Sequence, residues 1–231
     1  MPRNSNKDLI AVVAHGLGEL LPEVVFIGGA VTELYASVGM EVEEARPTDD
    51  VDCVIHITGR WKFAEFERKL RQHKFENDRE KIMRWHYAGI IVDVMPDDEK
   101  ILGFSNPWYA PGIERATDYA LTDTLSIRIF TLPYFLASKF TALFDRGMKD
   151  LRLSKDLEDI VFCFYYNSDV VQQIQTADSP VRTYLRNSVA RILAEPVIEE
   201  AIYATLPGGE VDEENVRLIM ERMKDVITAR V

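Results

Sequence analysis

Cysteine is scarce in this 231-residue sequence, and long apolar runs are missing from it. The two cysteines, Cys53 and Cys163, each lie within an apolar segment, a pattern that favours buried thiols in a reducing compartment over a disulfide. The longest uncharged apolar stretches, such as 11–14 and 24–27, are far shorter than the roughly 20 residues of a bilayer-spanning helix. The N-terminal residues also lack the apolar region of a signal peptide. We therefore expect a soluble, cytoplasmic protein with no membrane partner.

Positive charge is also in deficit, since 27 Lys and Arg stand against 38 Asp and Glu, for a formal net charge of −11. This balance argues against a protein that coats nucleic acid nonspecifically, because phosphate contacts need a positive field. Residues 60–86 are the exception, with nine cations and five acids. Either a solvated amphipathic helix or a local basic surface explains this segment. If the protein acts on an RNA, we expect that RNA to dock on the cations of this segment, namely Arg68, Lys69, Arg71 and Lys74.

The order of the predicted elements indicates two lobes. A hydrophobic fraction of 47% is enough for an ordinary globular core. Apolar spacing predicts helices over 7–21, 30–38 and 61–73, and strands over 24–27, 51–58, 86–95, 101–104, 116–121 and 125–130. From Thr131 onward the pattern is helical throughout, over 134–144, 155–166, 179–205 and 211–230. We expect an α/β (α+β) protein with a mixed-sheet lobe over 1–130 and a helical C-terminal lobe over 131–231.

Two aspartates, Asp50 and Asp52, open the predicted strand over 51–58. Residues two apart on a strand point to the same face, so both carboxylates would lie side by side. Parallel carboxylates repel each other unless a cation lies between them, and Mg²⁺ is the natural candidate because it prefers oxygen ligands. The alternative is a solvated strand edge.

A third acid, Asp93, lies between Val92 and Val94 in the next apolar strand. Such a carboxylate is costly to desolvate unless it is paired or binds a metal. If this strand lies beside the first, Asp93 joins Asp50 and Asp52 as a third ligand. The alternative is a partly exposed acid near the turn at 96–98.

Two glycines, Gly28 and Gly29, separate the strand over 24–27 from the helix that follows. Glycines in such a turn let backbone N–H groups approach a ligand, and the N-terminus of a following helix favours phosphate. The alternative is that the pair serves only as a turn.

The whole series, Gly28-Gly29, then Arg46-x-Thr48-x-Asp50-Val51-Asp52, then Asp93, resembles the nucleotidyltransferase superfamily with its polymerase-beta-like fold. The C-terminal half adds Lys139, Arg146-Gly147 and the run Lys155-Asp156-Leu157-Glu158-Asp159-Ile160, which is similar to the C-terminal motif of the AbiEii/AbiGii-type nucleotidyltransferase toxin family. Two departures stand out. Ala30-Val31 replaces the small hydroxyl residue expected after the glycines, with Thr32 supplied only later. The interval from Arg146 to Asp156 is also longer than expected, so Lys149-Asp150 is an alternative to Lys155-Asp156 for the matching pair; the second is preferred because Asp159-Ile160 follows it at the expected offset.

The resemblance implies transfer of a nucleoside monophosphate from an NTP, with Mg²⁺ or Mn²⁺ as cofactor and Asp50, Asp52 and Asp93 as catalytic metal ligands. The nucleotide-binding residues that it implies are Gly28, Gly29, Thr48, Lys139, Arg146, Asp156 and Asp159. Lys139 and Arg146 are seven apart, so on one helix both would face the triphosphate; the alternative is a pair of solvated cations. The acceptor would be tRNA or another cellular target, and an antitoxin protein would be the partner. A small-molecule nucleotidyltransferase of the antibiotic-modifying kind and a non-catalytic nucleotide-binding module are the alternatives. We expect the nucleotide and its metal to bind in a cleft between the two lobes.

Overall fold

The structure, a computed structural model, describes residues 5–37, 45–206 and 213–228. Contacts divide the chain into two compact units: unit 1 comprises residues 1–31 and 47–131, and unit 2 comprises residues 32–46 and 132–231. The chain therefore passes from one unit to the other three times. The predicted lobes differ from these units in one respect, because the segment Thr32–Arg46 makes its contacts with the helical unit.

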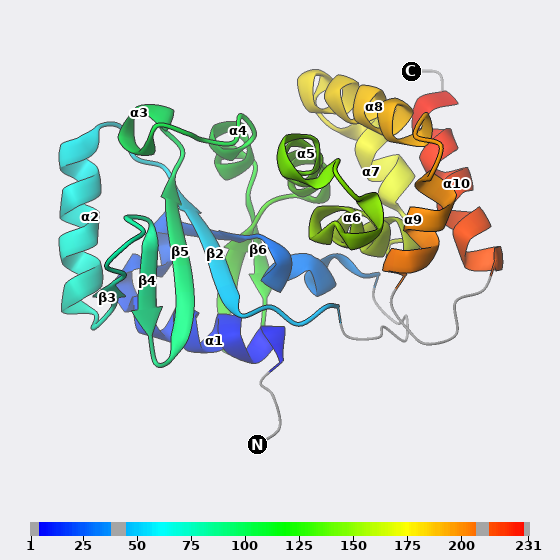
Figure 1. The fold of residues 1–231 in the computed structure, drawn as a ribbon. Helices are drawn as coiled ribbons and strands as arrows, with labels where there is room; N and C mark the ends of the chain where they lie inside the picture. Colours follow the sequence, from blue (N-terminus) through cyan, green and yellow to red (C-terminus); the bar gives the residue numbers. More distant parts are fainter. Residues whose placement is uncertain (1–4, 38–44, 207–212, 229–231) are drawn as a thin grey trace. The chain divides into compact units, whose positions relative to one another are not determined.

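Unit 1 is built on a seven-stranded mixed sheet, which confirms the predicted α+β class (Figure 1). The strands occur in the order β3-β4-β5-β2-β1-β7-β6. Their bounds are β1 (Val24–Ile27), β2 (Asp50–Ile55), β3 (Glu76–Asn77), β4 (Arg84–Tyr87), β5 (Ile90–Pro96), β6 (Thr117–Ala120) and β7 (Ser126–Ile129). The pairs β2–β5 and β1–β7 are parallel, and the other neighbours are antiparallel.

The two faces of this sheet differ in polarity. Val51, Cys53, Val92 and Val94 are buried on one face, whereas Asp50, Asp52 and Asp93, which alternate with them, lie on the other and are partly exposed. The helices α1 (Asn6–Leu17) and α2 (Arg60–Gln72) pack on the apolar face, where Gly16 lies against the ring of Tyr87 and the Arg71 guanidinium lies over Trp85. The acidic face is therefore the one left for chemistry.

Several local predictions for unit 1 need correction. Residues 86–95 form the hairpin β4–β5 rather than one strand, because Ala88 and Gly89 both adopt positive φ (49° and 81°) and turn the chain. Residues 101–104, predicted as a strand, lie in and just after the short helix α3 (Glu99–Leu102), whose first turn is capped by Asp98. The helix predicted over 7–21 ends at Leu17 and continues as the 3-10 helix η1 (Gly18–Glu23). A further helix, α4 (Tyr109–Glu114), was not predicted.

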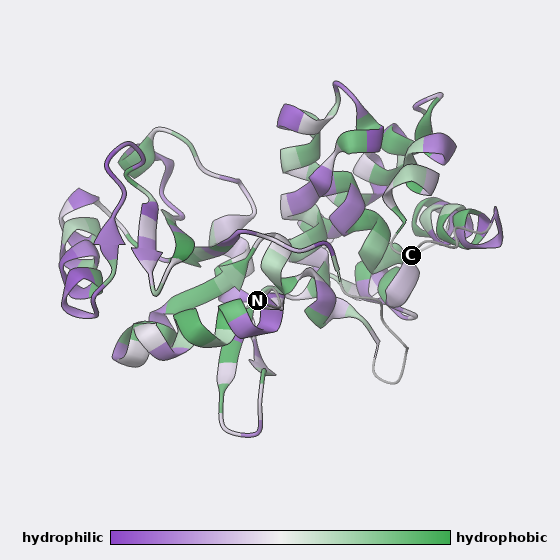
Figure 2. Ribbon diagram, turned by 60° about the horizontal axis from the view of Figure 1, so that its bottom comes forward, coloured by the Kyte–Doolittle hydropathy of each residue, from purple (hydrophilic) through white to green (hydrophobic). Residues whose placement is uncertain are grey.

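Unit 2 consists of helices with alternating polar and apolar bands (Figure 2). They are α5 (Leu132–Ala142), α6 (Lys155–Tyr166), α7 (Val170–Thr176), α8 (Ser179–Leu193), α9 (Ile198–Thr205) and α10 (Glu213–Thr228). A π turn, η3 (Leu143–Gly147), and a 3-10 turn, η4 (Leu151–Leu153), join α5 to α6. The predicted helix over 179–205 is two helices, since α8 ends shortly before Pro196.

The described residues of the segment Thr32–Arg46 are held against the helices of unit 2 by specific contacts. The ring centroid of Tyr35 lies 4.4 Å from that of Phe135. The backbone carbonyl of Tyr35 accepts a hydrogen bond from the Asn167 side chain at 2.6 Å. The Ser37 N–H donates to the carbonyl of Tyr166 at 2.9 Å. These contacts explain why the connection from β1 to β2 belongs with α5 and α6. The 3-10 helix η2 (Gly29–Tyr35) begins in unit 1 and ends in unit 2. No helix in the described ranges is long and apolar enough to cross a membrane.

Candidate functional site

The three predicted acids meet on the acidic face of the sheet. β2 lies beside β5 in parallel register, with Asp52 opposite Asp93, so the condition on which Asp93 would join the other two acids is met. One carboxylate oxygen from each of Asp50, Asp52 and Asp93 lies within 4.8 Å of the others. We call these residues the carboxylate triad. All three are partly exposed, so solvent reaches the triad.

The donor set of the triad suits a hard divalent cation. It offers only carboxylate oxygens, which Mg²⁺ and Mn²⁺ accept, and Mg²⁺ usually retains waters or phosphates beside one or two carboxylates. Cys53, on the other face of β2, is fully buried. Burial, together with the nearby Asp52 and Asp93 charges, raises the pKa of the Cys53 thiol well above its usual range. It therefore remains a packed thiol and supplies no ligand.

Gly28 lies directly against the triad. It follows β1, whose last residue Ile27 pairs with Asp52, and its φ is +77°. A Cβ atom added to Gly28 would overlap the Asp52 carboxylate. Two features of the structure therefore require glycine at position 28: the positive φ of its backbone and the lack of space for a Cβ beside Asp52. Gly29 is the first residue of η2.

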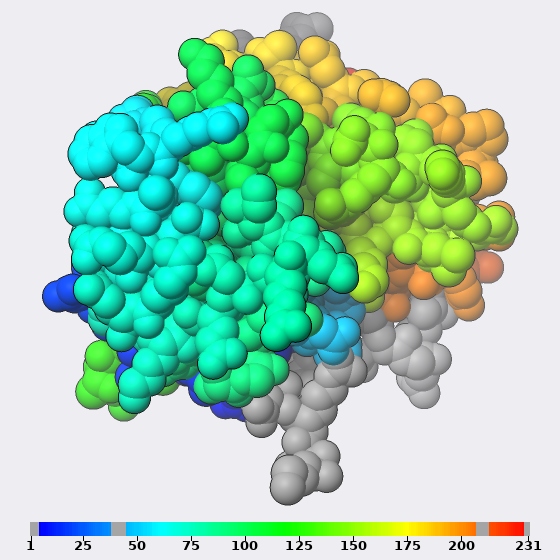
Figure 3. Space-filling model, turned by 60° about the vertical axis from the view of Figure 1, so that its left-hand side comes forward, coloured from blue at the N-terminus to red at the C-terminus, as the bar shows by residue number. Residues whose placement is uncertain are grey.

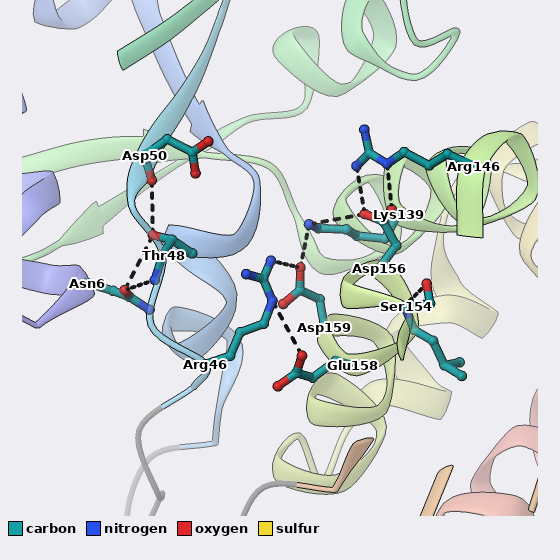
Figure 4. A network of polar contacts seen from close by, with 11 residues as sticks. Asn6, Arg46, Thr48, Asp50, Lys139, Arg146, Ser154, Asp156, Glu158 and Asp159 are labelled. Atoms are coloured by element: carbon teal, nitrogen blue, oxygen red, sulfur yellow. Dashed lines mark hydrogen bonds and ion pairs between the residues drawn. The ribbon is translucent and has the colours of Figure 1, made fainter. Parts of the chain in front are cut away.

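Thr48 supports the entry to β2 and is largely buried, with 7% of its surface exposed. Its backbone N–H donates to the Asn6 side-chain oxygen at 3.1 Å, and its hydroxyl donates to the Asp50 carbonyl at 3.0 Å (Figure 4). The hydroxyl that was predicted to bind nucleotide thus fixes the backbone that carries the triad. Its contribution to a ligand site is the placement of Asp50.

Arg84 also belongs to this site, although its place in the sequence indicates only that it is one of the cations of the basic segment 60–86. It lies opposite Asp93 across the β4–β5 hairpin, and its guanidinium donates two hydrogen bonds to that carboxylate, both at 2.8 Å. The hydrogen bonds to Asp93 dominate over partial burial and raise the pKa of Arg84 further. A two-residue turn at Ala88-Gly89 fixes this register, so the Ala-Gly pair was the signal that could have found the arginine.

A second group of charged residues surrounds the start of α6 in unit 2. The Lys139 ammonium on α5 forms ion pairs with Asp159 at 2.5 Å and with Asp156 at 3.7 Å. From the segment before β2, Arg46 reaches Asp159 at 3.1 Å and Glu158 at 3.7 Å (Figure 4). We call Arg46, Lys139, Arg146, Asp156, Glu158 and Asp159 the α6 ion-pair network.

Arg146 completes the network through two hydrogen bonds to Asp156, at 3.0 and 3.1 Å. It lies in the π-helical segment η3, which follows α5 without a break, and both Arg146 and Lys139 contact Asp156. The two cations therefore face a common carboxylate, and triphosphate binding by this face stays a prediction. The side chain of Arg146 is 70% exposed and that of Lys139 only 8%, so the alternative of a solvated cation fails for Lys139. Of the two alternative motif matches, Asp156 lies in the network, while Asp150 pairs with the exposed Arg152.

The local sequence explains how the network forms. Ser154 caps α6 by accepting a hydrogen bond from the Leu157 N–H at 3.3 Å, which puts Asp156 and Glu158 in the first turn, where acids are favoured. Burial is the largest influence on Arg46 and acts to lower its pKa, but Asp159, Glu158 and Asp156 together outweigh it and raise the pKa. Burial raises the pKa of the Glu158 carboxyl, although Arg46 counteracts part of the shift. The network contains three cations and three acids and is formally neutral.

Thr32, the only hydroxyl residue soon after the glycines, is fully buried and its hydroxyl has no hydrogen-bond partner among the described residues. In this structure it cannot contact a triphosphate. The sequence lacks a small hydroxyl residue directly after the two glycines, and the structure shows that the later Thr32 does not replace it.

Comparison with known proteins adds no further assignment: no family model matches this chain, and no curated protein is significantly similar to it.

Proposed function

We propose that this protein is a metal-dependent nucleotidyltransferase, which moves a nucleoside monophosphate from an NTP to a cellular acceptor. The observation that carries the proposal is the convergence of Asp50, Asp52 and Asp93 on one sheet face, with ligand oxygens within 4.8 Å of one another. The Gly28 turn directly beside Asp52 supports it, because backbone N–H groups in such turns bind phosphate.

In the proposed reaction the acceptor hydroxyl oxygen attacks the α-phosphorus of the NTP, and the bond to the β-phosphate oxygen breaks, so pyrophosphate leaves. Asp50, Asp52 and Asp93 would hold Mg²⁺, which stabilises negative charge on the attacking and departing oxygens of such displacements. Asp93 is the candidate to receive the proton of the acceptor hydroxyl.

The α6 ion-pair network is the candidate to bind the triphosphate. Its three cations already have carboxylate partners, so a triphosphate would have to exchange with them. Arg146 is the most accessible of the three, and its guanidinium suits the geometry of phosphate. We assign the triphosphate contact to Arg146 and the alignment of α6 to Lys139 and Arg46.

Calorimetry with each NTP, with and without Mg²⁺, tests the metal-dependent step. We expect wild type to bind an NTP only with Mg²⁺, and the double variant Asp50→Ala, Asp52→Ala to lose this dependence. Asp49→Asn is the matched control, because it removes an exposed acid of the same segment that lies outside the triad. Metal-dependent binding that survives in the double variant would overturn the assignment.

The acceptor is tested by incubating the protein with labelled NTPs and fractionated cell extract. Label in the RNA fraction, with growth arrest that Asp52→Ala relieves, would support the toxin-like reading with an RNA acceptor and an antitoxin partner. Label in the small-molecule fraction would support the antibiotic-modifying alternative.

The predicted RNA-docking cations lie on α2 and just after it, on the surface that this helix shares with the β3–β4 segment (Figure 3). Three of the four have acidic neighbours: Arg68 has Glu65 at 4.0 Å, Lys69 has Glu23 at 3.5 Å and Arg71 has Glu67 at 3.9 Å. Exposed pairs of this kind are weak and exchange readily with a phosphate. RNA docking at this surface stays a prediction, and we expect it to weaken steeply with salt.

A non-catalytic nucleotide-binding module is the second candidate, favoured by the burial of Thr32. It predicts Mg²⁺-dependent NTP binding with no labelled product in any fraction.

A further inference from the structure

The carboxylate triad already has a cation from the protein itself. Asp52, Asp93 and Arg84 form one row across β2, β5 and β4, because Asp52 pairs with Asp93 and Asp93 pairs with Arg84. Side chains directly opposite each other in paired strands lie on the same face. Arg84 is therefore placed at the triad by strand register.

The contact with Asp93 uses both oxygens of the carboxylate. Arg84 Nε donates to Oδ1 and Nη2 donates to Oδ2, each at 2.8 Å, which is the bidentate geometry of strong arginine–carboxylate pairs. The same Nη2 lies 3.9 Å from Asp50 Oδ2, so one guanidinium faces two of the three acids. The side chains of Arg84 and Asp93 are only 21% and 15% exposed, so water screens this pair poorly.

A divalent cation that binds all three acids must share the Asp93 carboxylate with the guanidinium, because each oxygen of Asp93 already accepts one hydrogen bond from Arg84. Bringing two cations together at one carboxylate is also electrostatically unfavourable. On the basis of the proposed function, we propose that Arg84 competes with the divalent metal for Asp93 and so lowers the metal affinity of the triad.

Mn²⁺ binding measured by calorimetry without nucleotide tests this competition. We expect Arg84→Gln to bind Mn²⁺ about tenfold more tightly than wild type, as is usual for removal of one energetic coupling. Arg84→Lys should lie between the two, because lysine retains the charge but loses the bidentate contact. Arg79→Gln is the matched control for net charge, since it removes an exposed arginine near the same hairpin, and its affinity should match wild type.

A purely structural ion pair makes the opposite prediction: Arg84→Gln would lower the thermal midpoint and leave Mn²⁺ affinity unchanged or weaker, and that result would overturn the inference. A second measurement uses the wild-type protein, so its result does not depend on whether the Arg84 variants fold. Titration with diamagnetic Mg²⁺ should shift the NMR signal of the Arg84 Nε–H as Asp93 is released, and an unchanged signal at saturating Mg²⁺ would also overturn it.

Asp52→Asn separates this inference from the proposed function. If Asp52→Asn binds Mn²⁺ as well as wild type, the triad is not the metal site and the proposed function fails. If Asp52→Asn abolishes binding but Arg84→Gln does not strengthen it, only the competition fails. In an Asp93→Asn background, Arg84→Gln should no longer increase the affinity.

Discussion

Gly28 gives the sharpest test at the scale of single residues. We expect Gly28→Ala to weaken Mn²⁺ binding by at least about tenfold, the loss typical of disturbing a group that orients a metal ligand. The reason is that its Cβ would displace the Asp52 carboxylate. Calorimetry with Mn²⁺ measures the change.

Gly103→Ala is the matched control for this variant. Gly103 has a similar φ of +84°, and an added Cβ would meet nothing within 4 Å, so both variants carry the same backbone cost of about 1 kcal/mol. If Gly103→Ala weakened Mn²⁺ binding equally, general destabilisation would explain the loss and the contact with Asp52 would not.

Residue spacing predicted the acids of the triad but not their cation. Asp50 and Asp52 are two apart on one strand, and that spacing alone puts them on one face. Arg84 and Asp93 meet only because a two-residue turn fixes the strand register, whereas apolar spacing predicts one continuous strand over 86–95. The partners of Lys139 and Arg146 depend on how α5, η3 and α6 pack, which periodicity within one helix does not contain.

At the scale of elements, the connection between β3 and β4 contains an acid whose ionisation depends on the fold. The Asp78 carboxylate accepts hydrogen bonds from the His86 side chain at 2.9 Å and from the N–H groups of Glu80 and Lys81 at 2.8 and 3.0 Å. These bonds, with that from His86 the largest, lower the pKa of Asp78 from 3.8 to about 2. Because the folded pKa is depressed, the stabilisation is present above about pH 4 and is lost as the pH falls toward 2.

We therefore expect the Asp78 carboxyl to titrate near pH 2 by carbon NMR, and His86→Ala to raise its pKa toward 3.8. His73→Ala is the matched control, because His73 pairs with Glu19 instead. Asp78→Asn should lose less stability than wild type between pH 4 and pH 2. A wild-type carboxyl that titrates at its ordinary value would show that the hydrogen bonds do not persist in solution.

Elements with strong periodicity or clear caps were predictable, and short elements were not. The helix predicted over 155–166 matches α6, which begins after a serine cap and ends before Asn167. Residues 101–104 resemble a strand by composition, but Asp98 caps a helical turn that includes the first two of them. In such four-residue segments a single cap outweighs intrinsic preference.

At the scale of the whole molecule, the least predictable feature is the membership of Thr32–Arg46 in unit 2. Sequence order places this segment between two strands of the sheet, so it was assigned to the first lobe. The contacts that bind it elsewhere join residues more than a hundred positions apart, such as Tyr35 with Asn167. No local pattern reports contacts of that kind.

Arg46 and Thr48, one on each side of Pro47, allow a test on the intact chain of the boundary between the two units. We expect Arg46→Ala to increase hydrogen exchange in α6, because Asp159 is buried and loses a charged partner. Thr48→Val should instead increase exchange at the start of α1 and β2, because it removes the hydroxyl contact with Asp50 and disturbs that with Asn6. Mass spectrometry measures both patterns. Identical patterns for the two variants would contradict the division at Arg46.

The contact between Arg46 and Asp159 also has a consequence for folding during translation. The two residues are 113 positions apart, and ribosomes add about 5–20 residues per second, so Arg46 emerges on the order of ten seconds before its partner exists. The last strand of the sheet, β7, ends at Ile129, before any residue of α6 has been made. Tyr35 and its apolar neighbours therefore leave the ribosome before Phe135 and Asn167, the residues that contact Tyr35 in the folded protein, have been synthesised.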